Sequence, residues 1–509
     1  MSFLLGIDIG TTGTKAVLIT EKGKLVEKAT AEYPLLTPKP NWAEQHPADW
    51  WGATKKVIAS ILKSSKVESK EIKGIGLSGQ MHGSVFLDKN GKVIRPAILW
   101  CDQRTQTECD DITSTFGYQR LLRLTCNPAL TGFTAPKILW LRRHEPHHWE
   151  KVRKILLPKD YVRFLLTGEF ATEVSDASGT LLFDVESRAW SDVVLKALRI
   201  PKNFLPECYE SCEVSGRITR RVALETGLAE GTLVVGGGGD QAAGAVGNGI
   251  VKRGVISSVI GTSGVLFAFS DHPEFDAAGR LHTFCHAVPN KWHMMGVTLA
   301  AGGSFRWLRD TLCQEEIALA RRKNVHPYEI MTGRAAEASP GSGGLIFLPY
   351  MIGERTPYPD PDARGVFFGL TLRHTKADLI RAVMEGVTFS LRDSLEIMRS
   401  LKIPIKEIRA SGGGGRSKLW RQMQADIFKA DVVTINIDEG SAFGAALLAG
   451  VGAGIYSSVE EACNATIRTT TKTSPHPQKV RLFEEYYEVY RSLYPALKDS
   501  FHRIASLSS

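Results

Sequence analysis

A short pattern of glycine and threonine occurs twice in this chain, each time between two apolar segments typical of strands. The first copy spans residues 6–15 and continues into the apolar run 16–19. The second lies within residues 255–268. Their central glycines, Gly10 and Gly261, are 251 residues apart in a chain of 509 residues. A repeat at nearly half the chain length predicts two structurally similar halves that face each other.

Both copies are interpreted as phosphate-binding hairpins. Glycines let the backbone come close to an anion, and successive N–H groups in such a turn form a concave donor surface. The hydroxyls of Thr11 and Thr12 add donors, and Asp8, just before the turn, is suited to hold hydrated Mg²⁺. A plain tight turn is the alternative for either copy alone. Two copies across a cleft would hold one polyphosphate.

Length and composition restrict the class of protein. A chain of 509 residues is too long for one core and favours two domains. The formal charge is +9, but Lys and Arg are scattered among acidic residues, so we expect no nucleic-acid partner. Eight cysteines without CxxC spacing predict neither a zinc site nor a disulfide framework. Because there is no basic leader and no apolar run of membrane-spanning length, we expect a cytoplasmic protein without membrane contact.

Apolar periodicity and turn residues predict the main elements. We expect strands over residues 24–33, 72–78, 84–88, 93–100, 293–298 and 345–349, and helices over 47–66, 136–144, 160–166 and 378–400. Residues 74–79 have the spacing GxGxxG. We reject a dinucleotide site there, because that motif must open a helix and more strand follows.

Polar and aromatic side chains follow two of the expected strands. Met81 and His82 follow the first, and Trp100 ends the second. Side chains at the ends of neighbouring strands can line a small polar pocket, with His82 binding hydroxyls and Trp100 covering a carbon skeleton. A core tryptophan and a surface histidine are the alternative.

Two further glycine-rich loops carry candidate site residues. A buried strand runs into four glycines, residues 236–239, followed by Asp240 and Gln241. A carboxylate at a strand end is a good general base, because the glycines leave room for substrate and burial brings its pKa towards working pH. A helix N-cap is the other interpretation of Asp240. The loop 411–417 opens a helix, and its glycines permit close contact with a planar ring such as adenine.

With these loops, a strand-end Asp and a duplication, the chain resembles the FGGY family of carbohydrate kinases and, within it, the xylulokinases. Residues 132–141 are similar to the N-terminal signature of the family, and residues 365–386 to its C-terminal one. The Met81-His82 pair and residues 353–357 also resemble the xylulokinase branch. The resemblance implies an α/β fold of two actin-like, ribonuclease-H-like ATPase domains that face each other across a cleft.

The resemblance also implies roles for individual residues. Asp240 corresponds to the catalytic base, and Asp8 to the aspartate near Mg²⁺ and the phosphates. The expected sugar-binding residues are Met81, His82, Trp100, Asp240 and Gln241, and the expected ATP-binding residues are Thr11, Thr12, Lys15, Gly261, Thr262, Gly302, Gly412, Gly413, Gly414 and Ser417. Gln241 stands where relatives often have Asn, which affects the expected sugar preference. Arg416 is given no role.

The predicted function is transfer of the γ-phosphoryl group of ATP to D-xylulose, with Mg²⁺ as cofactor. The alternatives are a kinase of another ketose or polyol, such as ribulose or glycerol, and a non-catalytic actin-like protein gated by nucleotide. Residues 1–245 are expected to form a domain with the sugar side and the first hairpin. Residues 246–509 are expected to carry the second hairpin, the adenosine loop and the C-terminal helices. A homodimer stays open.

Overall fold

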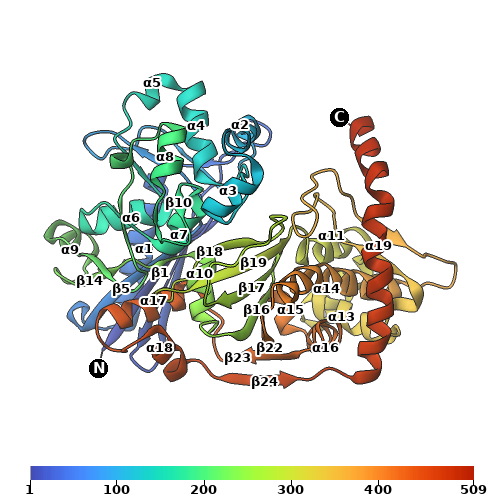
Figure 1. Cartoon of the computed structure of the whole chain (residues 1–509). Helices are drawn as coiled ribbons and strands as arrows, with labels where there is room; N and C mark the ends of the chain where they lie inside the picture. The colour runs from blue at the N-terminus through green and yellow to red at the C-terminus, as the bar shows by residue number, and fades with distance from the viewer. Residues whose placement is uncertain (1, 509) are drawn as a thin grey trace.

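Two seven-stranded mixed sheets form the framework of the molecule, one in each half of the chain (Figure 1). The structure is a computed structural model that describes residues 2–508. The first sheet contains β13 (Val214–Arg217), β14 (Leu233–Val235), β5 (Ile72–Gly79), β1 (Phe3–Ile9), β2 (Gly13–Thr20) and β3 (Leu25–Glu32) in this order, with β15 (Gly238–Gly239) also paired to β5. The second contains β18 (His282–Cys285), β19 (Trp292–Thr298), β17 (Gly264–Ser270), β16 (Gly254–Ile260), β22 (Ile405–Ser411), β23 (Asp431–Ile435) and β24 (Thr469–Thr473).

The two sheets repeat one topology. Strand β1 pairs antiparallel with β2 and parallel with β5, and β16 pairs antiparallel with β17 and parallel with β22. The Gly-Thr turns join β1 to β2 and β16 to β17, where the last pairs are Ile9 with Thr14 and Ile260 with Gly264. The duplicated α/β fold predicted from the repeat is therefore confirmed.

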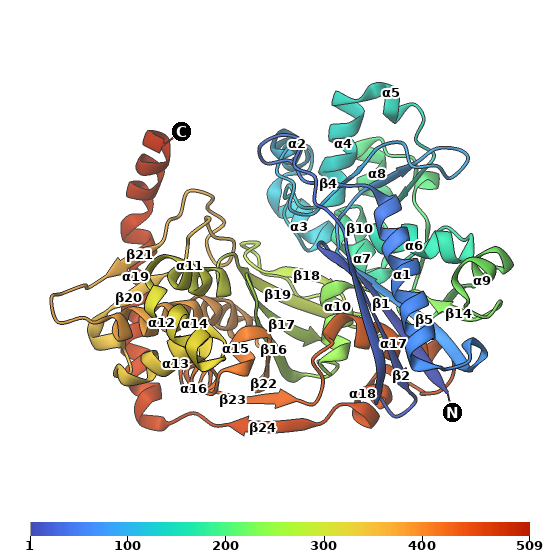
Figure 2. The same ribbon diagram turned by 180° about the vertical axis from the view of Figure 1, so that it is seen from behind.

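Two helices cross where the halves meet. Helix α10 (Asp240–Gly247) ends the first half, and α17 (Gly440–Gly452) comes from the second half but packs on β1 and β5 of the first sheet. Both lie between the sheets in two opposite views (Figure 2). Gly6 and Gly76 permit this contact, because a Cβ on either would overlap a carbonyl oxygen of α17, that of Ala442 or Ala445.

The other helices cover the sheets. In the first half they are α1 (Pro47–Ser65), α2 (Gln106–Phe116), α3 (Tyr118–Thr125), α4 (Thr134–His144), α5 (Pro146–Trp149), α6 (Pro158–Thr167), α7 (Val174–Ala177), α8 (Asp192–Leu198) and α9 (Arg220–Thr226). In the second half they are α11 (Gly302–Leu312), α12 (Gln314–Lys323), α13 (Pro327–Glu337), α14 (Lys376–Ser400), α15 (Gly412–Arg416), α16 (Lys418–Phe428), α18 (Val459–Thr466) and α19 (Pro477–Ser508). Among residues 2–508, no helix combines the length and the apolar character needed to cross a bilayer.

Most of the expected elements are present, and one strand was overextended. Residues 74–79 lie within β5, as the rejection of the dinucleotide motif required. The strand expected over 93–100 contracts to β7 (Ala97–Ile98). Pro96 precedes it, and proline lacks the N–H that a continuous ladder would need. Short pairs complete the structure: β4 (Glu44–Gln45), β6 (Val85–Leu87), β8 (Lys154–Leu156), β9 (Ala171–Glu173), β10 (Phe183–Asp184), β11 (Ala189–Trp190), β12 (Glu207–Tyr209), β20 (Ile346–Leu348) and β21 (Val366–Phe368).

Candidate active site

Asp240 lies in a cavity between the two halves of the chain. It is the first residue of α10, directly after β15, and its carbonyl oxygen accepts a hydrogen bond of 3.0 Å from Ser441 Oγ of the second half. The cavity has a volume of about 270 Å³ and is also lined by Gln241, Gly412 and Arg416. Burial raises the pKa of Asp240 to about 7, and the nearby carboxylate of Asp8 adds to this rise. The side chain can therefore exchange a proton near neutral pH.

Asp8 has the features of a cation ligand. It stands near the end of β1, opposite Ser78 of β5 and Lys15 of β2. Burial raises its pKa, against the opposing effects of Ser78 and Lys15. Its Oδ1 atom is buried and accepts no hydrogen bond from any part of the chain that the structure describes. A buried carboxylate oxygen without a partner fits a hydrated Mg²⁺ ion, whose oxygen ligands are carboxylates and waters.

The first Gly-Thr turn is held by side chains from neighbouring loops. Gln45 Nε2 donates to the carbonyl oxygen of Thr11 at 2.7 Å, and Trp100 Nε1 donates to Thr11 Oγ1 at 3.0 Å. Trp100, predicted to cover the sugar, thus lies against the first hairpin, with 41% of its surface exposed. Thr12 is exposed on the same turn. The ammonium of Lys15 is paired with Glu439 of the second half.

His82 is held as a neutral imidazole. It adopts a left-handed backbone conformation, with φ of 67°. Its Nδ1 lies 2.6 Å from the carbonyl oxygen of Gly179, which can only accept, so Nδ1 donates and Nε2 is left as an acceptor. Burial, followed by the charge of Lys137, lowers the pKa of His82 to about 3. The ring also packs edge-on against Phe133 at 4.8 Å. His82 can therefore accept a hydrogen bond from a hydroxyl.

Met81 connects the expected sugar residues to Asp240. It is buried, and a Cβ added to Gly239 would lie 2.8 Å from Met81 Cγ. Gly239 immediately precedes Asp240, so the Met-His bend packs on the backbone that carries the expected base. The structure thus brings together Met81, His82, Asp240 and Gln241, which lie about 160 residues apart in the sequence.

A larger cavity, of about 940 Å³, lies in the second half of the chain beside the second Gly-Thr turn. The predicted ATP-binding residues that line it are Gly261, Thr262, Gly302, Gly413, Gly414 and Ser417. The turn is hydrogen-bonded to the start of α11, because the N–H groups of Gly302 and Gly303 donate to the carbonyl oxygens of Gly261 and Thr262. Arg416 lines both this cavity and the one that contains Asp240.

Some residues that line the larger cavity were not predicted from the sequence. They are Phe305, Arg306, His326, Tyr328 and Glu329, which belong to α11, α13 and the residue before α13. No glycine motif marks these residues. Only the packing of α11 and α13 brings them to the turn, so the sequence offered no local signal for them.

Comparison with known proteins gives the family. Residues 3–247 match the N-terminal domain of the FGGY family of carbohydrate kinases, and residues 256–453 match its C-terminal domain. The chain belongs to this family. The resemblance and the actin-like fold class predicted from the sequence are thereby confirmed.

Individual relatives of this FGGY kinase cover its whole length. Xylulose kinase of Bacillus subtilis is 40% identical over 98% of each chain. The crystal structure of xylulose kinase from Rhodospirillum rubrum superposes with a TM-score of 0.91 at 30% identity, covering 98% of this chain and 100% of that one. Gluconokinase of Bacillus subtilis is 33% identical over 99% of this chain and 98% of its own. Relatives with different sugars therefore share one scaffold.

Proposed function

We propose that this FGGY kinase transfers the γ-phosphoryl group of ATP to the terminal hydroxyl of D-xylulose and forms D-xylulose 5-phosphate. The observation that carries the proposal is the position of Asp240 in the cavity between the halves, next to the backbone on which Met81 packs. The xylulose kinases among its relatives support this choice of sugar. Family membership argues against the alternative of a non-catalytic actin-like protein.

Asp240 accepts the proton of the attacking hydroxyl. A carboxyl group with a pKa of about 7 is ionised in a useful fraction of molecules at neutral pH, yet remains basic enough to take the proton. His82 accepts a hydrogen bond from another hydroxyl through Nε2, and Met81 packs against the carbon chain. The amide of Gln241 stands beside the carboxylate and lowers its pKa against the effect of burial.

The nucleotide occupies the 940 Å³ cavity, with its base towards Gly413 and Gly414 and its phosphates at the turn of Gly261 and Thr262. Backbone N–H groups of such turns bind phosphate oxygens. Asp8 would hold Mg²⁺, which supplies charge neutralisation on the phosphates when bound. Thr11, Thr12 and Lys15 of the first turn then face the γ-phosphoryl group as the halves close.

Closure of the halves excludes water from the transfer. The domains that move are residues 1–245 and 246–509, except that α17 packs on the first sheet and moves with it. We also propose that the protein is cytoplasmic.

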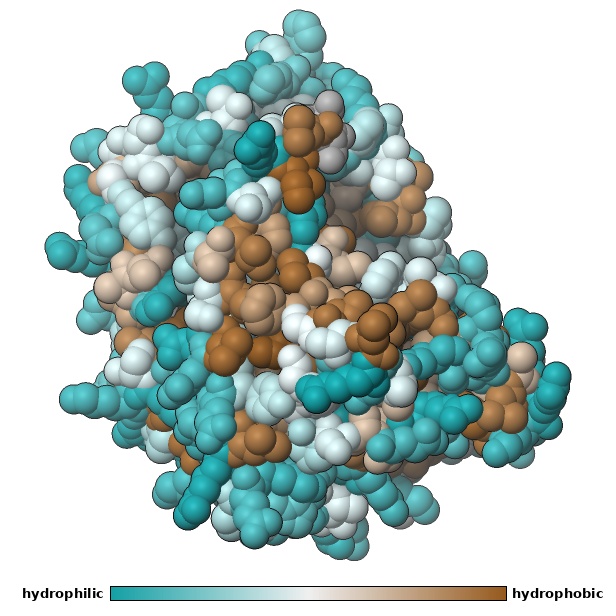
Figure 3. All heavy atoms as spheres, turned by 90° about the vertical axis from the view of Figure 1, so that its right-hand side faces the viewer, coloured by the Kyte–Doolittle hydropathy of each residue, from teal (hydrophilic) through white to brown (hydrophobic). Residues whose placement is uncertain are grey.

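The homodimer remains a proposal as well. Apolar side chains gather in the middle of the face that lies at the right of Figure 1 (Figure 3). Exposed large apolar residues in this half include Ile352, Phe368, Leu370 and Leu372. Contiguous apolar surface is typical of interaction sites.

The experiment that tests the function is an assay of ADP release with purified protein over D-xylulose, D-ribulose, glycerol and D-gluconate. D-gluconate is included because a gluconokinase is among the full-length relatives. We expect kcat/KM for D-xylulose to exceed that for each of the other three substrates by about tenfold or more. A higher value for another substrate would assign a different kinase, and ADP release that no sugar stimulates would overturn kinase activity.

A further inference from the structure

A loop of the second half is bonded to the second sheet near the place where β18 begins. Strand β18 pairs with β19 only as far as His282 opposite Met295. Beyond that pair, the loop 351–364 lies along β19. The N–H of Thr356 donates to the carbonyl oxygen of Val297 at 3.1 Å, and the N–H of Val297 donates to Thr356 Oγ1 at 3.2 Å. The loop is therefore fixed to β19 through Thr356.

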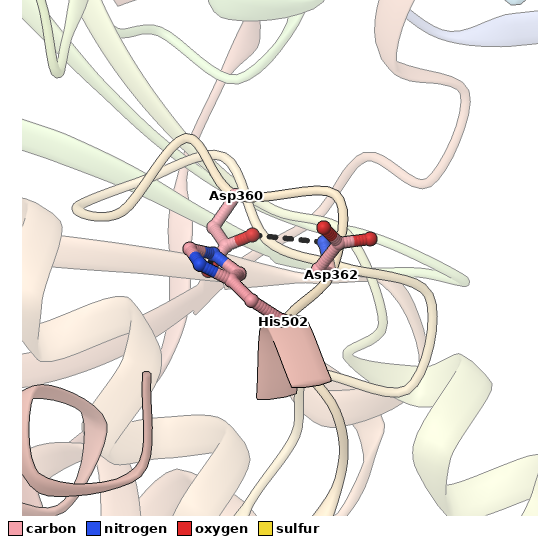
Figure 4. A group of neighbouring side chains, drawn as sticks. All are labelled: Asp360, Asp362 and His502. Carbon is pink, nitrogen blue, oxygen red and sulfur yellow. Dashed lines mark hydrogen bonds and ion pairs between the residues drawn. The ribbon is translucent and has the colours of Figure 1, made fainter. Parts of the chain in front are cut away.

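The far end of this loop is anchored on helix α19 (Figure 4). Asp360 Oδ2 accepts hydrogen bonds from Tyr494 Oη at 2.7 Å and His502 Nε2 at 3.2 Å, and its Oδ1 accepts from the N–H of Asp362 at 2.8 Å. Asp360, Asp362 and His502 offer ligand atoms within 4.8 Å of one another. Both oxygens of Asp360 are already engaged, so this cluster acts as a structural anchor. Two backbone hydrogen bonds between Glu354 and Asp360 close the loop.

Arg355 stands between two residues that are fixed in place. Glu354 is buried and accepts hydrogen bonds from Thr298 Oγ1 and from the N–H of Leu299. Thr356 is fully buried and donates through Oγ1 to the carbonyl oxygen of Arg280 at 2.8 Å. The backbone of Arg355 is thus held rigidly at the edge of the sheet.

The guanidinium of Arg355 makes no hydrogen bond, ion pair or ring contact with any side chain or carbonyl among residues 2–508. Burial lowers its pKa. A guanidinium that is partly withdrawn from water without a protein partner is costly. A rigid backbone that presents such a group fits a ligand-binding role better than a structural one.

The surroundings of Arg355 connect it to the sugar side of the cleft. Thr356 bonds to Arg280, two residues before His282, whose ring lies 5.9 Å from that of Phe133. Phe133 in turn packs against His82. The positive charge of Arg355 contributes to the lowered pKa of both His82 and His282. Arg355 therefore lies near His82 and His282, and it comes from the other half of the chain.

We propose that Arg355 binds the sugar, donating hydrogen bonds to the carbonyl oxygen and the adjacent hydroxyl at the end of the ketose remote from Asp240. This inference rests on the proposed function. A ketose carbonyl can only accept hydrogen bonds, and neutral His82 offers only an acceptor at Nε2, so a donor must come from elsewhere. The planar guanidinium fork matches two neighbouring oxygens.

The test is a pair of variants, Arg355→Gln and Arg355→Lys, with Arg364→Gln as matched control. Arg364 lies on the same loop, but its guanidinium donates to the carbonyl oxygens of Pro361 and Ala363. We expect Arg355→Gln to raise KM for D-xylulose about 10- to 100-fold, because the variant loses charge-assisted hydrogen bonds to the sugar. KM for ATP should stay within about twofold in all three variants.

A second measurement distinguishes a specific loss of ketose binding from a general disturbance of the site's structure. The dissociation constants of D-xylulose and xylitol, which carries a hydroxyl in place of the carbonyl, are compared by calorimetry for the wild type and the variants. Arg355→Gln should weaken D-xylulose more than xylitol, and Arg355→Lys should lie between it and the wild type. Equal losses for both sugars, or an unchanged KM for D-xylulose, would overturn this inference.

The outcomes for the function and for Arg355 are distinguishable. A wild-type enzyme that prefers D-gluconate or glycerol overturns the proposed function in the substrate assay, before any variant is made. A wild type that phosphorylates D-xylulose, combined with an Arg355→Gln variant that does so with unchanged KM, overturns the role of Arg355 alone.

Discussion

The ammonium nitrogen of Lys15 lies 3.0 Å from a carboxylate oxygen of Glu439, so the first hairpin is tied to the second half of the chain. Lys28 approaches the other oxygen of Glu439 at 2.7 Å. Glu439 immediately precedes α17, the helix that packs on the first sheet. Lys15 was predicted from the sequence to bind ATP. If Lys15 binds ATP as proposed, Glu439 competes with the nucleotide phosphates for the same ammonium.

Replacing Glu439 by Gln should release Lys15 for the nucleotide. We expect the KM for ATP to fall about two- to fivefold, which is the scale of a partly exposed ion pair. Lys15→Gln should raise it instead. Lys28→Gln is the matched control, because it leaves the pair of Lys15 with Glu439 in place. If Lys15→Gln leaves ATP binding unchanged, Lys15 is not an ATP ligand and only joins the halves.

Asp240→Asn tests the general base. The substitution preserves shape and polarity but removes the proton acceptor, so kcat should fall by about 10²–10⁴ while ATP binding is kept. Asp192→Asn is a suitable control, because that carboxylate is exposed and paired with Lys202 on the surface of the first half. A kcat for Asp240→Asn within about tenfold of the wild type would remove Asp240 from the mechanism.

The same carboxylate makes stability depend on pH. Its pKa rises from 3.8 to about 7 on folding, so the folded protein binds a proton that the unfolded chain has already lost. The stabilisation that this proton provides is complete below pH 3.8 and disappears as the pH rises through 7. Asp240→Asn should therefore raise the melting temperature more at pH 8 than at pH 5, measured without nucleotide and with a chelator present. An equal shift at both pH values would mean that the folded pKa of Asp240 is ordinary.

We expect His82 to contribute to sugar binding and not to ATP binding. His82→Ala removes the Nε2 acceptor. We expect KM for D-xylulose to rise about tenfold, because the loss of one buried hydrogen bond weakens binding by about that factor. KM for ATP should change little, because the 940 Å³ cavity lies elsewhere. Steady-state kinetics with each substrate varied in turn gives both values. Equal increases in the two constants would place His82 outside the sugar pocket.

The sequence predicted those parts of the site that short motifs encode. Local sequence patterns predicted the Gly-Thr turns, the glycine loops and the position of Asp240 at a strand end. The repeat at half the chain length predicted the duplicated fold. Residues 353–357 were singled out only by their resemblance to the xylulokinases, and the sequence assigned no role to Arg355. Its position depends on hydrogen bonds to β19 and on an anchor on α19 that lie far away in the chain. The strand expected over residues 93–100 failed for a local reason, the missing N–H of Pro96.

Gly76 illustrates a tertiary constraint that a strand pattern conceals. Within β5 it looks like a weakening residue, yet α17 packs on its Cα so closely that a methyl group would overlap the carbonyl oxygen of Ala445. Gly76→Ala must push α17 away from the first sheet, and we expect a loss of roughly 1–3 kcal/mol in the free energy of unfolding. Gly52→Ala is the matched control, because a Cβ there, inside α1, meets nothing within 4 Å. That control should stabilise the protein by about 0.5–1 kcal/mol, since alanine favours a helix over glycine. Chemical denaturation of both variants measures the difference. If Gly76→Ala were as stable as the wild type, the contact between α17 and β5 would not be the close one that joins the second half to the first.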